Sequence, residues 1–162
     1  MEFISLFEEF DPNIKADSAS YKKLVQTIKF LEGKKKILFL TTSNRGEYAV
    51  KELGEVPKST QLAHIIQDYL GKSKCDLIEV PDLKIYPCEG NVSHREGNSC
   101  GVKKAKLGDK EKNPSGNHRC WASFNNEDDE LWKISLKLLE CDAVVFWGSV
   151  RWGQMNSVYQ KL

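Results

Sequence analysis

Short, almost wholly apolar runs recur along the chain, and polar or helix-patterned segments separate them. They are Lys36–Thr41, Leu77–Val80 and Ala143–Trp147. Runs of this length, rich in Ile, Leu and Val, are typical of strands buried on both faces of a parallel sheet. The pattern therefore predicts three strands.

Helical spacing fills the intervals between these runs. The segment 59–71 begins with Ser59 and Thr60 and ends at Gly71, and Asp128 with Asp129 suits the start of a second helix by capping and by dipole. A glycine-punctuated loop, 148–153, leads into a last helical start that ends at Leu162. This order predicts an α/β fold with a right-handed, doubly wound parallel sheet. The apolar faces of the two inner helices are Leu62, Ile65, Ile66, Tyr69 and Leu70, then Leu131, Ile134, Leu138 and Leu139.

A helical extension, residues 1–33, precedes this domain, which covers 34–162. Asp17 is the expected cap of its second helix, and Gly33 the expected end. We expect the extension to pack on the domain, with a subunit contact as the alternative. A long stretch poor in apolar periodicity, 87–126, is expected to be an elaborated loop or insertion. The expected apolar positions of the extension are Phe3, Phe7, Phe10, Leu24, Ile28 and Leu31.

Composition narrows the class of protein. The chain has 162 residues, 40% hydrophobic and 29% charged, with a formal net charge of +1. No apolar run reaches the roughly 20 residues that a membrane span needs, and the first ten residues make a poor signal peptide. The lysine run 103–106 has no interleaved aromatic residues, so we expect no nucleic-acid partner. A cytoplasmic protein is expected.

The five cysteines are an odd number with no secretory signal, which favours reduced thiols. Zinc is the alternative for the Cys/His-containing loop, but the ligand spacing matches no standard finger. We therefore expect no metal. The candidate ligands are Cys88, His94, Cys100, His118 and Cys120.

Ligands of doubly wound sheets bind beyond the carboxyl ends of the strands, where the winding reverses. The two loops at that place are 41–60 and 148–154. Hydroxyl and amide groups in the first loop, together with Arg45 and a helix N-terminus, suit a phosphate group. The alternative is a solvated loop with Ser59 as a plain helix cap. Neither a Walker sequence nor G-x-G-x-x-G occurs, which argues against a nucleotide triphosphatase and a dinucleotide-binding domain.

Two stretches carry a family resemblance. Thr-Ser-Asn-Arg at 42–45, followed by Ser-Thr-Gln-Leu-Ala at 59–63, resembles the phosphate loop of NAD(P)H-dependent FMN reductases and related flavodoxin-like proteins. Phe-Trp-Gly-Ser-Val-Arg-Trp-Gly-Gln-Met at 146–155 is similar to the run that cradles the flavin ring in that family. The chain departs from the family by an insertion, 46–58, and by Ser149 and Arg151, where Pro and Tyr are usual.

The resemblance implies a flavodoxin-like fold that binds FMN and takes electrons from NAD(P)H for a small-molecule acceptor. The chemistry would lie on the flavin, with no catalytic side chain. Trp152 would border the ring and Arg151 would favour negative charge on the reduced flavin, the alternatives being a structural tryptophan and a surface ion pair. Cys88 alone remains of the cysteine cluster of the iron–sulfur relatives, so no cluster is expected. The implied FMN-binding residues are Ser43, Asn44, Arg45, Ser59, Thr60, Ser149, Val150, Arg151, Trp152, Gly153 and Gln154.

Flavodoxin-like sheets ordinarily have five strands, and the sequence predicts three. The third strand would then lie at an open edge, a site for aggregation or for pairing with a partner. A fragment, a truncated product and a second chain that completes the sheet all stay open, as does a homo-oligomer. The alternative function is a non-catalytic flavodoxin-like domain for binding or partner docking.

Overall fold

The computed structural model describes residues 7, 10, 13, 15–43, 52–88, 108–118, 120–151, 153–159 and 162, with the backbone alone at 121, 151 and 155. The elements, in chain order, are α2 (Ala19–Glu32), β1 (Ile37–Thr41), α4 (Lys58–Leu70), β2 (Cys75–Glu79), the 3-10 helix η1 (Val80–Asp82), α6 (Trp121–Asn125), α7 (Leu131–Glu140), β3 (Ala143–Trp147), β4 (Val150–Arg151) and β5 (Gln154–Met155). None of the helices in the described residues is long and apolar enough to cross a membrane.

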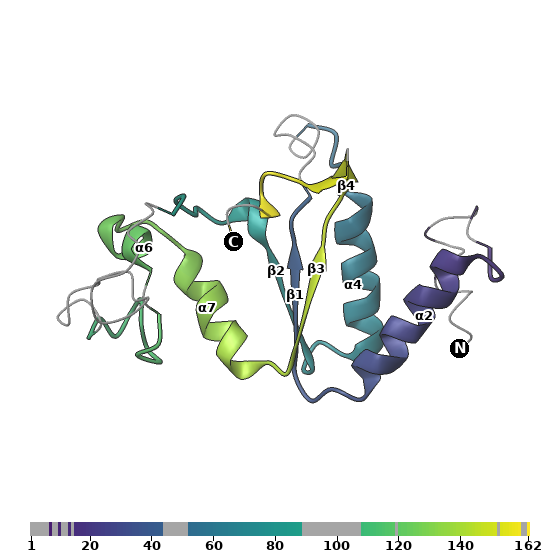
Figure 1. Ribbon diagram of the computed structural model, residues 1–162, viewed down its shortest axis with the longest axis horizontal. Helices are drawn as coiled ribbons and strands as arrows, with labels where there is room; N and C mark the ends of the chain where they lie inside the picture. Colours follow the sequence, from purple (N-terminus) through teal and green to yellow (C-terminus); the bar gives the residue numbers. More distant parts are fainter. Residues whose placement is uncertain are drawn as a thin grey trace.

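The three predicted strands form one parallel sheet in the order β2-β1-β3. The central strand β1 is buried along its whole length, which explains why every one of its residues except the last is apolar. The crossover from β1 to β2 passes through α4, and the crossover from β2 to β3 passes through α7 on the opposite face (Figure 1). The winding therefore reverses beside β1, and the predicted α/β class with a doubly wound parallel sheet is confirmed.

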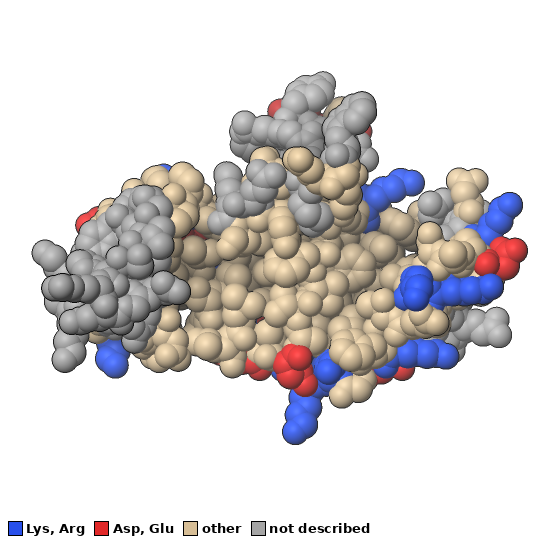
Figure 2. All heavy atoms as spheres, in the orientation of Figure 1, with Lys and Arg blue, Asp and Glu red and all other residues tan. Residues whose placement is uncertain are grey.

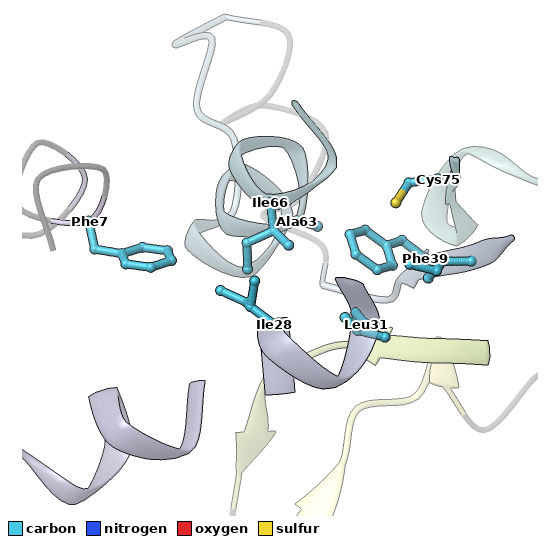
Figure 3. Close-up of a cluster of buried hydrophobic side chains, with 8 residues drawn as sticks. Phe7, Ile28, Leu31, Phe39, Ala63, Ile66 and Cys75 are labelled. Carbon is cyan, nitrogen blue, oxygen red and sulfur yellow. The ribbon is translucent and has the colours of Figure 1, made fainter. Parts of the chain in front are cut away.

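One face of the sheet is covered by α4, and α2 packs on the same side of the sheet (Figure 1). Phe39 of β1 meets Ala63 and Ile66 of α4, and Ile28 and Leu31 of α2 are buried in the same cluster (Figure 3). Phe7 also lies in this cluster and is fully buried. The helix that ends at Gly33 thus packs on the domain through the apolar face expected from its spacing.

The other face is covered by α7. Leu38 and Leu40 of β1 are buried against Ile134 of α7 and against Val80 and Ile85, which follow β2. Because both faces of β1 are buried, its sequence is a continuous apolar run and does not alternate between apolar and polar residues.

One of the two predicted helix starts differs from expectation. The N-cap of α2 is Ser18, whose hydroxyl accepts a hydrogen bond from the Tyr21 N–H at 3.2 Å, so the assignment of the cap to Asp17 is wrong. At α7, Asp129 carries the predicted role: its carboxylate accepts the N–H of Leu131 at 2.9 Å and that of Tyr86 at 3.0 Å. This buried carboxylate therefore joins the helix start to the segment that leaves β2.

The end of the chain also differs. We expected a helix after residue 153, and the described residues instead form the antiparallel hairpin β4–β5, followed by turn residues at 157 and 158 and by a 3-10 residue at 159. Pairing of Arg151 with Gln154 closes the hairpin over two residues, and Gly153 takes a φ of 76° there. A positive φ is accessible to glycine at little cost, which explains why the chain turns at this position. Within the stretch 87–126, which was expected to lack regular structure, the described part contains the short helix α6.

Candidate functional site

Two loops meet at the carboxyl edge of the sheet, where the winding reverses. Thr41, the last residue of β1, lies in register with Trp147, the last residue of β3. The backbone N–H of Thr42 continues this ladder by donating to the carbonyl oxygen of Trp147 at 2.9 Å. The loops that follow β1 and β3 therefore begin side by side. Ligands of open α/β sheets bind at such a place, beyond the carboxyl ends of two strands where the winding reverses.

Three serines are joined at this point, although two of them are 106 positions apart. The Ser59 hydroxyl donates to the Ser43 Oγ at 2.6 Å, and the Ser149 backbone N–H donates to the same oxygen at 3.1 Å. The Oγ atoms of Ser43 and Ser149 are also within hydrogen-bond distance, at 3.1 Å. Ser43 is 7% exposed and lies at the centre of what we call the serine cluster, Ser43, Ser59 and Ser149.

Helix α4 begins beside the serine cluster without a side-chain cap. Its N-cap is Pro57, and no side chain accepts a hydrogen bond from the first turn. The alternative role of Ser59 as a plain helix cap is therefore wrong: Ser59 lies inside the first turn and donates to Ser43 instead. Within the described chain, the N–H groups of Lys58, Ser59 and Thr60 have no recorded partner, as expected at an uncapped helix start. These groups, with the positive end of the helix dipole, suit an anion.

Thr60 adds a buried hydroxyl to the same helix start. Its side chain is 1% exposed, and its Oγ1 has no hydrogen-bond partner among the described residues. The Oγ1 of Thr42, the residue before Ser43, is also buried and without a hydrogen-bond partner among the described residues. A buried hydroxyl without a partner costs about 1–3 kcal/mol. A buried polar group without a partner calls for an explanation, and a bound water, ion or ligand at this helix start would provide one.

The hairpin β4–β5 contains the second group of predicted residues. Val150 pairs with Met155 and Arg151 with Gln154 in this ladder. Part of the backbone that we expected to bond a flavin is therefore engaged within the hairpin. A Cβ added at Gly153 would meet nothing within 4 Å, so the glycine is needed for its φ and not for space.

Asn156, which the sequence reading did not select, fastens this hairpin to the first loop. Its Nδ2 donates to the carbonyl oxygen of Thr42 at 2.8 Å, and its Oδ1 accepts the N–H of Tyr159 at 3.0 Å. The Tyr159 ring then packs edge-on against Phe146 of β3, with centroids 5.1 Å apart. A single asparagine after a hairpin gives no sequence signal for a contact 114 positions away.

The structure thus brings together Ser43, Ser59, Thr60 and Ser149, and it places Val150, Gly153 and Gln154 in the hairpin that follows. Asn44, Arg45 and Trp152, and the side chain of Arg151, lie outside the described residues. Their predicted roles stay predictions.

His118, one of the five candidate zinc ligands, is buried and satisfied by serines. Its Nδ1 and Nε2 lie 2.8 Å from the hydroxyls of Ser135 and Ser123, respectively. Burial lowers its pKa, which favours the neutral ring. No group of three metal-ligating side chains occurs among the described residues, which include Cys88 and Cys120 but neither His94 nor Cys100.

Comparison of the whole chain with known protein families, with curated proteins and with solved structures finds no match.

Proposed function

We propose that this domain is flavodoxin-like, that it binds FMN at the carboxyl edge of its sheet, and that it transfers electrons from NAD(P)H to a small-molecule acceptor. The observation that carries the proposal is the serine cluster, which lies at the winding reversal and beside the uncapped start of α4. The resemblance of 42–45, 59–63 and 146–155 to NAD(P)H-dependent FMN reductases supports the same reading.

The donor set fits a phosphate monoester. Backbone N–H groups at a helix start and several hydroxyls can bond the phosphate oxygens. The hydroxyls of the serine cluster bond one another, so a ligand can redirect them by rotation alone. Thr60 supplies a buried hydroxyl that has no hydrogen-bond partner among the described residues. Ser43, Ser59, Thr60 and Ser149, with Asn44 and Arg45 from the resemblance, would hold the phosphate.

The hairpin would border the flavin ring. Residues 149–154, in the run 146–155, would provide this border, and the family resemblance assigns Trp152 and Arg151 to the ring itself. The bound flavin would supply hydride and electron transfer, which protein side chains cannot perform. The chain would contribute position, through the hairpin and the Asn156 contact to Thr42, and electrostatics. No side chain is required as an acid or base.

Titration of the purified chain with FMN tests the binding half of this proposal. We expect quenching of flavin fluorescence at a stoichiometry of one, and anaerobic loss of the absorbance of bound oxidised flavin when NADH or NADPH is added. Absence of binding would refute the proposal. Binding without reduction by either nucleotide would instead favour the non-catalytic binding domain.

A further inference from the structure

The outer edge of β3 is apolar and has none of the features that usually keep an edge strand from pairing with another chain. Its sequence, Ala-Val-Val-Phe-Trp, holds no charged residue and no proline, and in the described chain no strand pairs with that edge. Phe146 is 43% exposed, and Leu138 and Leu139 at the end of α7 are 43% and 55% exposed. In Figure 2 few charged side chains lie over the middle of the molecule, between α7 and α4.

The opposite edge of the sheet, β2, is protected in the ordinary way. It contains Asp76 and Glu79, and Asp76 forms ion pairs with Lys36 and Lys137 at 3.3 and 3.2 Å. Charged side chains on an edge strand discourage pairing with other chains. The contrast indicates that β3, and not β2, is the edge suited to a partner.

The hydrogen-bond ladder fixes which backbone groups of β3 point outward. The carbonyl oxygen of Trp147 faces β1, because it accepts the N–H of Thr42. In a parallel pair, every second residue directs its N–H and C=O to the same neighbour. Val145 and Trp147 therefore face β1, and Val144 and Phe146 direct their backbone groups outward.

We propose that β3 pairs with β3 of a second copy of this chain, antiparallel and centred on Val145, to give a continuous six-stranded sheet. In this register Val144 lies opposite Phe146 of the other copy, so the outward backbone groups of the two strands satisfy each other. Small residues also meet large ones on both faces: Ala143 lies opposite Trp147, and Val144 opposite Phe146. No like charges meet, because the strand has none. Among the strands of the described sheet, β1 is central and β2 is charged, so β3 is the strand this chain can offer.

The state of association of the full chain tests this pairing, without flavin and independently of the proposed function. We expect a dimer by sedimentation or light scattering. Phe146→Glu should shift it to monomer by placing like charges across the two-fold axis. Phe30→Glu is the matched control, since Phe30 is 61% exposed and lies on α2, which is not part of the sheet. Val144→Pro should also give monomer, because it removes an outward N–H that has no hydrogen-bond partner among the described residues. Thermal melting checks that the variants fold. A wild-type monomer, or a dimer that survives both substitutions, would overturn the proposal.

A disulfide tests the register. Two copies of residue 145 would form a directly opposed, non-hydrogen-bonded pair with Cα atoms about 4.5 Å apart, within reach of a disulfide. Val145→Cys should therefore yield a covalent dimer on treatment with diamide, which takes up the electrons of the two thiols. Ala143→Cys, whose partner in the other copy is Trp147, should not. Wild-type protein under the same treatment controls for the native cysteines. A dimer that cross-links through position 143 and not 145 would overturn the proposed register.

Discussion

Charged side chains fasten the amino ends of the strands, whereas hydroxyl groups join the chain at their carboxyl ends. At the amino ends, the Asp142 carboxylate accepts the N–H groups of Lys35 and Lys36 at 3.1 and 2.9 Å, which ties the start of β3 to the start of β1. These backbone donors lower the pKa of Asp142. Burial alone would raise the pKa of Asp76 nearby, but its bonds with Lys137 and Lys36 outweigh burial and lower it.

At the carboxyl ends of β1 and β3, the hydroxyl groups of the serine cluster join the chain instead of carboxylates. Its members satisfy one another, yet the hydroxyl of Thr60 and the first N–H groups of α4 have no recorded partner in the described chain. The difference shows at which end of the sheet the described residues pair their own polar groups. The amino end has its charges matched by the chain itself, while the carboxyl end has spare donors and is suited to an anion.

The largest expected effect comes from placing a negative charge at the carboxyl end. Ser59→Asp would set a carboxylate against the phosphate of FMN, and we expect binding to weaken by about 100-fold or more, because two unit charges about 4 Å apart near a surface repel by about 4 kcal/mol. The free energy of unfolding should stay equal or rise by about 0.3–1 kcal/mol, since an acidic residue in a first turn favours the helix dipole. Fluorescence titration and urea unfolding measure the two.

Ser73→Asp is the control for this change. Ser73 is exposed at the amino end, where its carbonyl oxygen accepts Lys36 Nζ. The same charge there should leave FMN affinity unchanged. Equal weakening in both variants would mean that charge acts at long range and that the carboxyl end is not the site.

A smaller effect is expected from Thr60→Val, which removes the buried hydroxyl at nearly constant volume. Loss of one hydrogen bond to a charged ligand should weaken FMN binding by about 10- to 100-fold, from about 1.5–3 kcal/mol. Stability without ligand should not fall, because the hydroxyl has no recorded partner to lose. The exposed Thr27→Val in α2 is the control. A clear loss of stability with unchanged affinity would assign Thr60 to the fold instead.

Ser43→Ala should cost stability at the carboxyl end. It leaves the Ser59 hydroxyl and the Ser149 N–H without their acceptor. Both groups are partly open to water, so we expect the free energy of unfolding to fall by about 1 kcal/mol, the low end for an unsatisfied group. Urea unfolding measures it, with Ser73→Ala as the control. No change would show that the cluster does not hold the two loops together.

The smallest effect, which is followed through its dependence on pH, is expected at the amino end. Since the pKa of Asp142 is lowered in the folded chain, its contribution is present above the unfolded value of about 3.9 and is lost as the pH falls through the lower folded value. Asp142→Asn should therefore be slightly less stable than the wild type at pH 7, and the difference should shrink towards pH 2. Urea midpoints at both pH values check this, and a difference that grows in acid would contradict it.

The strands and helices could be predicted because each buries an apolar run or an apolar face. The helix α4 and strand β3 follow directly from that pattern. Contacts between distant residues could not be read in this way. The sequence left Ser59 either as a phosphate-binding residue or as a plain helix cap, and its hydrogen bond to Ser43 in the folded chain argues against the cap. The hairpin β4–β5 was missed because Gly148 and Gly153 were read as one loop, although Gly153 in a two-residue turn is itself a hairpin signal.

The most direct test of the carboxyl-end site compares FMN with riboflavin, which has the same ring and no phosphate. If the serine cluster and the start of α4 hold the phosphate, wild-type protein should bind FMN at least about 10-fold more tightly than riboflavin, the equivalent of one bond to a charged group. Ser59→Asp should then remove this preference while leaving riboflavin affinity unchanged. Equal affinity of the wild-type chain for the two flavins, or no affinity for either, would contradict the proposed site.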